Sequence, residues 1–191
     1  SRAAMLQAYA ANAGAEDAEA MARWLTLTGL NSDSMLIVTA PSSNSPLLVS
    51  ARSHIKGYVP PGLVQQALEG KTPVFSQLFF HDDKPRIAIA VRMHKTSDKV
   101  LMLTTTPQNL VSAAQNTTDQ GALIAVTDGN GRMLARSVQA DRYIGTPVPD
   151  RQKLQEGGAS TGTLEAERAA KGNVVFAFHE IKGTPGWVIV A

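Results

Sequence analysis

The stretch LIAVTDGNGRMLARSVQADRYIGTPV, residues 123–148, decides the fold. An apolar run leads into Asp128-Gly129-Asn130-Gly131, and a second run, Met-Leu-Ala-Arg-Ser, follows the turn. Asp and Asn side chains stabilise tight turns by bonding nearby backbone groups, and glycine accepts a positive φ. We therefore predict a β-hairpin with strands at 122–127 and 132–137. We interpret Asp128 as a turn residue rather than as the acid of an ion pair with Arg136.

Downstream of this hairpin, three further segments are typical of strands. They cover residues 162–166, 173–179 and 187–191, and glycine-containing turns at 170–172 and 183–186 separate them. The two strands of the hairpin and these three strands together predict one antiparallel five-stranded sheet.

The N-terminal half repeats this order of elements. Apolar segments indicate strands at 35–39, 47–51, 74–80, 86–94 and 100–105. Pro60-Pro61-Gly62 opens a short helix over 63–69 that Gly70 closes, and Thr106-Pro107 begins another that runs to about residue 115.

The two halves align at one offset of 87 residues. Leu36-Ile37 then matches Leu123-Ile124, Ala88 matches Val175, and Val91 matches Phe178. A shared element order at a constant offset predicts a tandem duplication, with two superposable sheets over about 33–115 and 119–191. The replacement of Ala88 by a larger residue predicts that the second half has less internal space.

Residues 3–13 and 15–28 are rich in strong helix formers. We predict one long helix, or two collinear helices divided near Gly14. Met21, Trp24 and Leu25 form an apolar stripe, which we expect to pack on the first sheet or on a second copy of the helix.

Composition excludes several classes of function. The 191 residues are 43% apolar and carry a net charge of +2, and no run of lysine and arginine is dense enough to follow a nucleic-acid backbone. There is no cysteine, and the longest apolar runs are five residues, far below the roughly 20 of a membrane helix. We expect the chain to be a piece of a longer protein whose flanking membrane spans lie outside it.

These motifs resemble the double Cache sensor regions of bacterial receptors. Besides residues 123–148, the similar stretches are GTPGWVIVA (183–191), LLVSAR (47–52), PPGLVQQALEGKTPVFSQLF (60–79) and PRIAIAVRM (85–93). The resemblance implies an α+β fold with a long N-terminal helix (1–30), followed by a membrane-distal PAS-like lobe (31–116) and a membrane-proximal PAS-like lobe (117–191). Each lobe is expected to hold a five-stranded antiparallel sheet with flanking helices.

The same resemblance implies a function. The implied function is small-molecule sensing by the periplasmic domain of a sensor histidine kinase in the inner membrane. This domain is expected to dimerise through the N-terminal helix and to use no cofactor. The input domain of a chemoreceptor or diguanylate cyclase is an alternative, as is a ligand-free dimerisation module. Residues 52–70 lack the Arg-x-Trp-Tyr signature of the amino-acid-binding subgroup, and Val91-Arg92-Met93 stands where Val-Pro-Val is usual.

No motif predicts catalysis or metal binding. The four histidines do not lie at the spacing that places two ligands on one metal ion, and Gly-x-Ser-x-Gly is absent. A hydrolase or transferase is therefore disfavoured, and we predict no catalytic and no metal-ligating residue.

The candidate ligand site lies in the first lobe. Side chains alternate between two faces along residues 86–94. One face carries small residues and cations, namely Arg86, Ala88, Ala90 and Arg92. The other face is apolar, and we expect it to pack on a helix. We predict that Arg52, Tyr58, Ser76 and Arg92 converge there to bind a small polar or anionic ligand. The alternative is that Arg86 and Arg92 are solvated edge charges and that Ser76 faces a neighbouring group.

Overall fold

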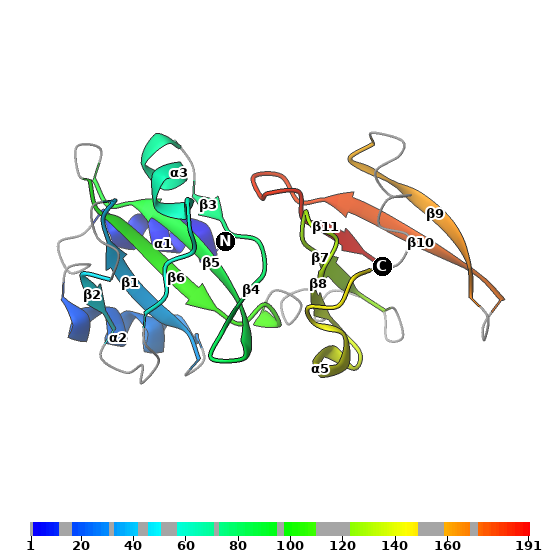
Figure 1. The fold of residues 1–191 in the computed structure, drawn as a ribbon, viewed down its shortest axis with the longest axis horizontal. Helices are drawn as coiled ribbons and strands as arrows, with labels where there is room; N and C mark the ends of the chain where they lie inside the picture. Colours follow the sequence, from blue (N-terminus) through cyan, green and yellow to red (C-terminus); the bar gives the residue numbers. More distant parts are fainter. Residues whose placement is uncertain are drawn as a thin grey trace. The chain divides into compact units, whose positions relative to one another are not determined.

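The computed structural model describes residues 2–11, 17–30, 33–41, 46–50, 57–70, 73–94, 98–109, 123–148, 159–168 and 172–191. The chain divides into two compact units, Ser1–Thr106 and Pro107–Ala191 (Figure 1). Within the described ranges, no helix has the length and apolar character needed to cross a membrane. The predicted helix that begins at Thr106-Pro107 lies mostly outside these ranges.

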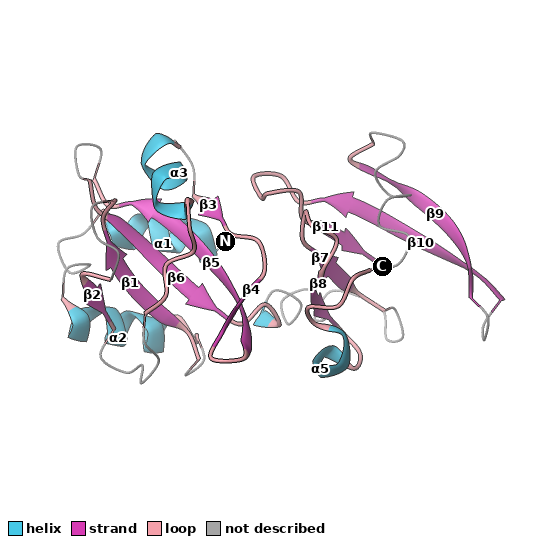
Figure 2. Ribbon diagram, viewed as in Figure 1, coloured by secondary structure: helices cyan, strands magenta, loops and turns pink. Residues whose placement is uncertain are grey.

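The first unit is an antiparallel sheet with helices on both faces (Figure 2). Its strands follow the order β2-β1-β6-β5-β3, and β4 also pairs with β5. The elements are α1 (Arg2–Ala10), α2 (Ala18–Leu27), β1 (Met35–Thr39), β2 (Leu48–Val49), α3 (Leu63–Glu69), β3 (Val74–Phe75), β4 (Phe79–His81), β5 (Lys84–Arg92) and β6 (Val100–Thr105).

This sheet has six strands where five were predicted, because the segment 74–80 is interrupted. Phe75 pairs with Ile89, and Phe79 pairs with Arg86. The two pairs are four residues apart along the segment 74–80 but only three residues apart along β5. An extra residue of this kind is a β-bulge. Ser76 lies at the interruption, where its amide donates to the Ala88 carbonyl and its hydroxyl accepts from the Ala88 amide, at 2.9 and 2.8 Å.

The N-terminal segment forms two helices on one face of the sheet. Asp17 begins α2 by accepting a hydrogen bond from the Glu19 amide, as an N-cap residue does. α1 contacts β5 and β6, whereas α2 contacts β1, so the helices cover different strands. Gly14, where the division was predicted, lies outside the described residues.

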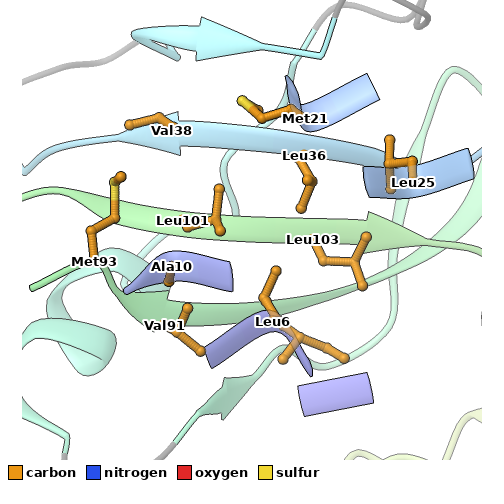
Figure 3. Close-up of a cluster of buried hydrophobic side chains, with 11 residues drawn as sticks. Leu6, Ala10, Met21, Leu25, Leu36, Val38, Val91, Met93, Leu101 and Leu103 are labelled. Atoms are coloured by element: carbon orange, nitrogen blue, oxygen red, sulfur yellow. The ribbon is translucent and has the colours of Figure 1, made fainter. Parts of the chain in front are cut away.

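Side chains from these helices form the first core of the unit (Figure 3). Leu6 and Ala10 come from α1 and Met21 and Leu25 from α2, and they pack on Leu36, Val38, Ile89, Val91, Met93, Leu101 and Leu103. The predicted burial of Met21 and Leu25 is confirmed. Trp24 is half-buried and stacks on Tyr9, with ring centroids 5.1 Å apart.

The opposite face of the sheet packs on α3. Leu63 and Ala67 of this helix meet Met35, Ile37, Ala88, Ala90, Val100 and Met102 in a second core. Even-numbered residues of β5 therefore face α3 and odd-numbered ones face α1, which confirms the predicted division of the strand.

The second unit holds the predicted five-stranded antiparallel sheet, in the order β8-β7-β11-β10-β9. Its elements are β7 (Ala125–Thr127), β8 (Met133–Arg136), α5 (Ala140–Tyr143), β9 (Thr161–Arg168), β10 (Gly172–Glu180) and β11 (Val188–Val190). In the β7–β8 hairpin, buried Asp128 accepts from the Arg132 amide at 2.8 Å, and Gly131 has φ of 76°. The interpretation of Asp128 as a turn residue is confirmed.

The same path through both sheets confirms the duplication, but the offset of 87 is wrong. In the first sheet, Ala90 pairs with Val74 on one side and Met102 on the other. In the second sheet, Phe178 pairs with Gly162 and Val190 in the same way. Each residue of the second set therefore lies 88 positions after its counterpart in the first. Central strands such as β1 are buried on both faces. A one-residue slip there matches one apolar residue with another, and the sequence does not reveal it.

Candidate functional site

The small residues of β5 line the α3 side of the first sheet. Ala88 and Ala90 are buried there, and Arg86 precedes them on the same face. Arg86 pairs across the sheet with Phe79 of β4, and Ala88 pairs with Thr104 of β6. A charged side chain thus enters an otherwise apolar face of the sheet.

Arg86 is fully buried, with an exposed fraction of 0%. Its Nη1 donates to the backbone carbonyl of Asp33, just before β1, whereas Nε and Nη2 have no hydrogen-bond partner among the described residues. Burial lowers the pKa of the Arg86 guanidinium, against the opposing effect of the Asp33 and Asp82 carboxylates. Arginine nevertheless stays protonated in proteins, so the face carries a buried positive charge.

Nearby carboxylates contact other basic side chains. Asp33 Oδ1 lies 3.4 Å from Lys84 Nζ, and Asp82 Oδ2 lies 3.6 Å from His81 Nε2. In the part of the chain that the structure describes, no carboxylate oxygen lies within 4 Å of the Arg86 guanidinium. The charge of Arg86 is therefore balanced only at a distance.

A second polar group lies on the same face. Thr104 is buried, and within the described ranges its hydroxyl has no hydrogen-bond partner. Because Thr104 is directly opposite Ala88, the hydroxyl and the guanidinium flank the smallest side chains of the face. Buried polar groups in proteins are nearly always paired, so a face that holds two such groups invites a binding explanation.

Three aromatic rings form a group that includes the cross-strand partner of Arg86. Tyr58 approaches Phe79 with ring centroids 5.3 Å apart and stacks on His81 at 5.4 Å and an interplanar angle of 21°. Phe79 is the cross-strand partner of Arg86. Tyr58 is 37% exposed, so its ring forms the outer side of this group. The arrangement joins a buried cation to an aromatic wall that reaches the surface.

The four predicted ligand residues are placed differently. Tyr58 belongs to the aromatic wall, whereas the hydroxyl of Ser76 is bonded to the backbone of the bulge. Arg92 is exposed at the far end of β5 and donates from Nη1 to the Leu68 carbonyl at 3.4 Å. Arg52 lies outside the described residues. Their convergence on a ligand stays a prediction.

Sequence reasoning placed Arg86 on the right face but left it out of the site. The alternative considered for Arg86, a solvated edge charge, is wrong, because the side chain is fully buried. The available signal was its position two residues before Ala88, on the same face of the strand as the small residues. Its burial depends on the Asp33 carbonyl, 53 residues earlier in the chain.

The second unit fills the equivalent face with aromatic side chains. At the corrected offset, Ala88 corresponds to Phe176 rather than to Val175, and Ala90 corresponds to Phe178. A Cβ added at Gly162 would lie 2.9 Å from the Phe178 ring, so this ring packs directly on the opposite strand. Arg86 corresponds to Val174, so the sequence has no cation at that position.

Comparisons with solved structures identify the fold. No protein-family model matches the chain, and no curated protein matches its sequence. The chain is similar to the extracellular domain of rpHK1S-Z16, which carries a histidine kinase assignment, at 14% identity and a TM-score of 0.64, over 91% of this chain and 74% of that one.

Two chemoreceptor domains are similar to the same extent. The ligand-binding domain of Pseudomonas fluorescens CtaA, in complex with L-isoleucine, has a TM-score of 0.64 at 17% identity. That of Pseudomonas aeruginosa PAO1 PctB, in complex with L-Gln, has a TM-score of 0.62 at 15% identity. Each match covers 97% of this chain and 80% of the other.

The chain therefore has the fold of the extracellular ligand-binding domains of membrane receptors. The predicted resemblance to double Cache sensor domains is confirmed at the level of the fold. Histidine kinases and chemoreceptors share this fold, so it does not distinguish between the two classes.

Proposed function

We propose that this chain is the periplasmic ligand-sensing domain of a sensor histidine kinase in the inner membrane. The observation that carries the proposal is the buried Arg86 on the α3 face of the first unit, two of whose donors have no partner among the described residues. Its cross-strand neighbour Phe79 contacts the ring of Tyr58. Such a guanidinium is a poor contributor to stability, because buried polar groups without partners are costly. A polar ligand would supply the missing acceptors.

Strand β5 offers a route from ligand to helix. Arg86, Ala88 and Ala90 face α3, whereas Ile89 and Val91 lie on the other side of the same strand, in the core that α1 and α2 complete. A ligand acts by favouring the arrangement that it binds more tightly. A displacement of β5 on ligand binding would therefore alter the packing of the N-terminal helices. We propose that the receptor dimerises through these helices, with membrane spans that flank the chain.

The principal alternative is the input domain of a chemoreceptor, supported by the similarity to CtaA and PctB. The full gene distinguishes the two, since the output domain follows the second membrane span. A ligand-free dimerisation module is favoured by a different observation, the exposure of Leu27 at the end of α2, which is 86% exposed.

A thermal-shift screen of the purified domain tests the sensing function. We expect at least one compound of a library of small metabolites to raise Tm in a concentration-dependent manner. Ligand at 100 times Kd stabilises a protein by about 2.7 kcal/mol, which raises Tm by roughly 10 °C in a domain of this size. If no compound changes Tm while sedimentation shows a stable dimer, the dimerisation module is correct and the sensor proposal is wrong.

A further inference from the structure

We infer that the ligand of the first unit is a small monocarboxylate, which binds side-on to Nε and Nη2 of Arg86. This inference rests on the proposed sensing function and names the class of ligand that the same site recognises.

The orientation of the guanidinium sets the kind of acceptor. Nη1 is bonded to the Asp33 carbonyl, and the two nitrogens without a partner among the described residues are Nε and Nη2. These two lie on the same edge of the planar group, and their N–H bonds point in parallel. Two parallel donors match the two oxygens of one carboxylate, a geometry in which arginine binds such groups with two hydrogen bonds. A lone carbonyl or hydroxyl oxygen would satisfy only one of them.

The electrostatics of the site require a negative charge. Arg86 is 0% exposed, and its only hydrogen bond in the described part of the chain goes to a neutral carbonyl. The carboxylates of Asp33 and Asp82 contact Lys84 and His81 instead. A buried charge is tolerated far better when a hydrogen-bonded counter-ion accompanies it. One buried cation calls for one carboxylate, which favours a monocarboxylate over a dicarboxylate.

The surroundings of Arg86 suit a short, partly apolar body. Ala88 leaves the least side-chain volume next to the guanidinium, and the Thr104 hydroxyl opposite it can bond a hydroxyl or keto oxygen of the ligand. Phe79 and Tyr58 provide an apolar wall. Because Arg86 is inaccessible, a ligand reaches it only after side chains above it move, and the exposed ring of Tyr58 is the outermost of the aromatic group.

The test compares carboxylates with their amides in matched variants. The probes are propionate, lactate and pyruvate, with propionamide and lactamide as isosteric neutral controls, measured by thermal shift and titration calorimetry. The variants are Arg86→Met, which removes the charge, Arg86→Lys, which keeps the charge without the paired donors, and Arg23→Met. Arg23 lies on α2 with 64% of its side chain exposed, so its replacement changes net charge equally without touching the site.

We expect at least one carboxylate to bind the natural protein and its amide not to bind. One charged hydrogen bond corresponds to about 10- to 150-fold in affinity, so Arg86→Lys should weaken binding by at least this factor and Arg86→Met, which loses both bonds, by more. Arg23→Met should bind within twofold of the natural protein. In a ¹H–¹⁵N NMR spectrum, the Arg86 Nε–Hε signal, assigned by its loss in Arg86→Met, should move downfield with the carboxylate alone.

Other outcomes overturn the inference in distinguishable ways. If a library compound binds but neither these carboxylates nor any other carboxylic acid does, the sensing function stands and the ligand class is wrong. If a carboxylate binds Arg86→Met as tightly as the natural protein, the anion site lies elsewhere. If nothing in the library binds, the sensing function and the ligand class fail together.

Discussion

Replacing Arg86 with methionine should change the stability of the unliganded protein only modestly, because of how the side chain is bonded. Arg86 is fully buried and makes one hydrogen bond, from Nη1 to the Asp33 carbonyl, within the described residues. Losing a hydrogen bond that involves a charged group costs about 1.5–3 kcal/mol. Replacing buried ion pairs with apolar residues of similar volume often returns about 1–4 kcal/mol, and we expect a return of the same order for the buried charge of Arg86.

The two contributions oppose each other. We therefore expect the free energy of unfolding of Arg86→Met to lie within about 2.5 kcal/mol of the natural value, on either side of it. A guanidinium with a complete set of structural partners would behave differently, because breaking a buried ion pair costs about 3–5 kcal/mol. Residues kept for binding rather than for stability often show this pattern.

Urea unfolding followed by tryptophan fluorescence provides the measurement. The chain has two tryptophans, and Trp24 lies in the first unit and Trp187 in the second. In a Trp187→Phe background, the signal therefore reports the unit that contains Arg86, and the same background without the Arg86 change is the control. A loss of 3 kcal/mol or more in the absence of ligand would refute the reasoning and assign Arg86 a structural role.

Three further substitutions separate structural from binding contributions. Arg92→Ala should lower stability by less than about 0.5 kcal/mol and ligand affinity less than tenfold, by urea unfolding and calorimetry, since the side chain is exposed. Ser76→Ala should cost about 1–3 kcal/mol in urea, because the buried Ala88 amide loses its acceptor; an unchanged midpoint would contradict that contact. Gly162→Ala should cost about 1–3 kcal/mol, followed by Trp187 fluorescence in a Trp24→Phe background, because its Cβ would meet the Phe178 ring; full stability would show that the ring can move.

Elements with local signals could be predicted from the sequence. The helix Leu63–Glu69 begins after Gly62 and ends before Gly70, as expected, and the hairpin at Asp128 follows its turn residues. These signals lie within a few residues of the structure that they specify. For this reason the order of elements and the duplication were accessible without coordinates.

Features that depend on distant partners could not be predicted. The split between β3 and β4 depends on the pairing of Phe79 with Arg86, and no local residue marks it. The offset between the units was one residue short, because β1 is apolar on both faces. The burial of Arg86 depends on a carbonyl 53 residues away, so the alternation along β5 fits a solvated arginine equally well.

Alternation along β5 also bears on how such a domain can evolve. Even-numbered residues face α3 and the proposed ligand, and odd-numbered ones lie in the core that α1 and α2 complete. A mutation at Ala88 or Ala90 can therefore change what is recognised without altering the contacts made by Ile89 and Val91. The second unit illustrates this freedom, since Phe178 occupies the position of Ala90 within the same order of strands. Diversification of ligands and conservation of the helical output can thus proceed on opposite faces of a single strand.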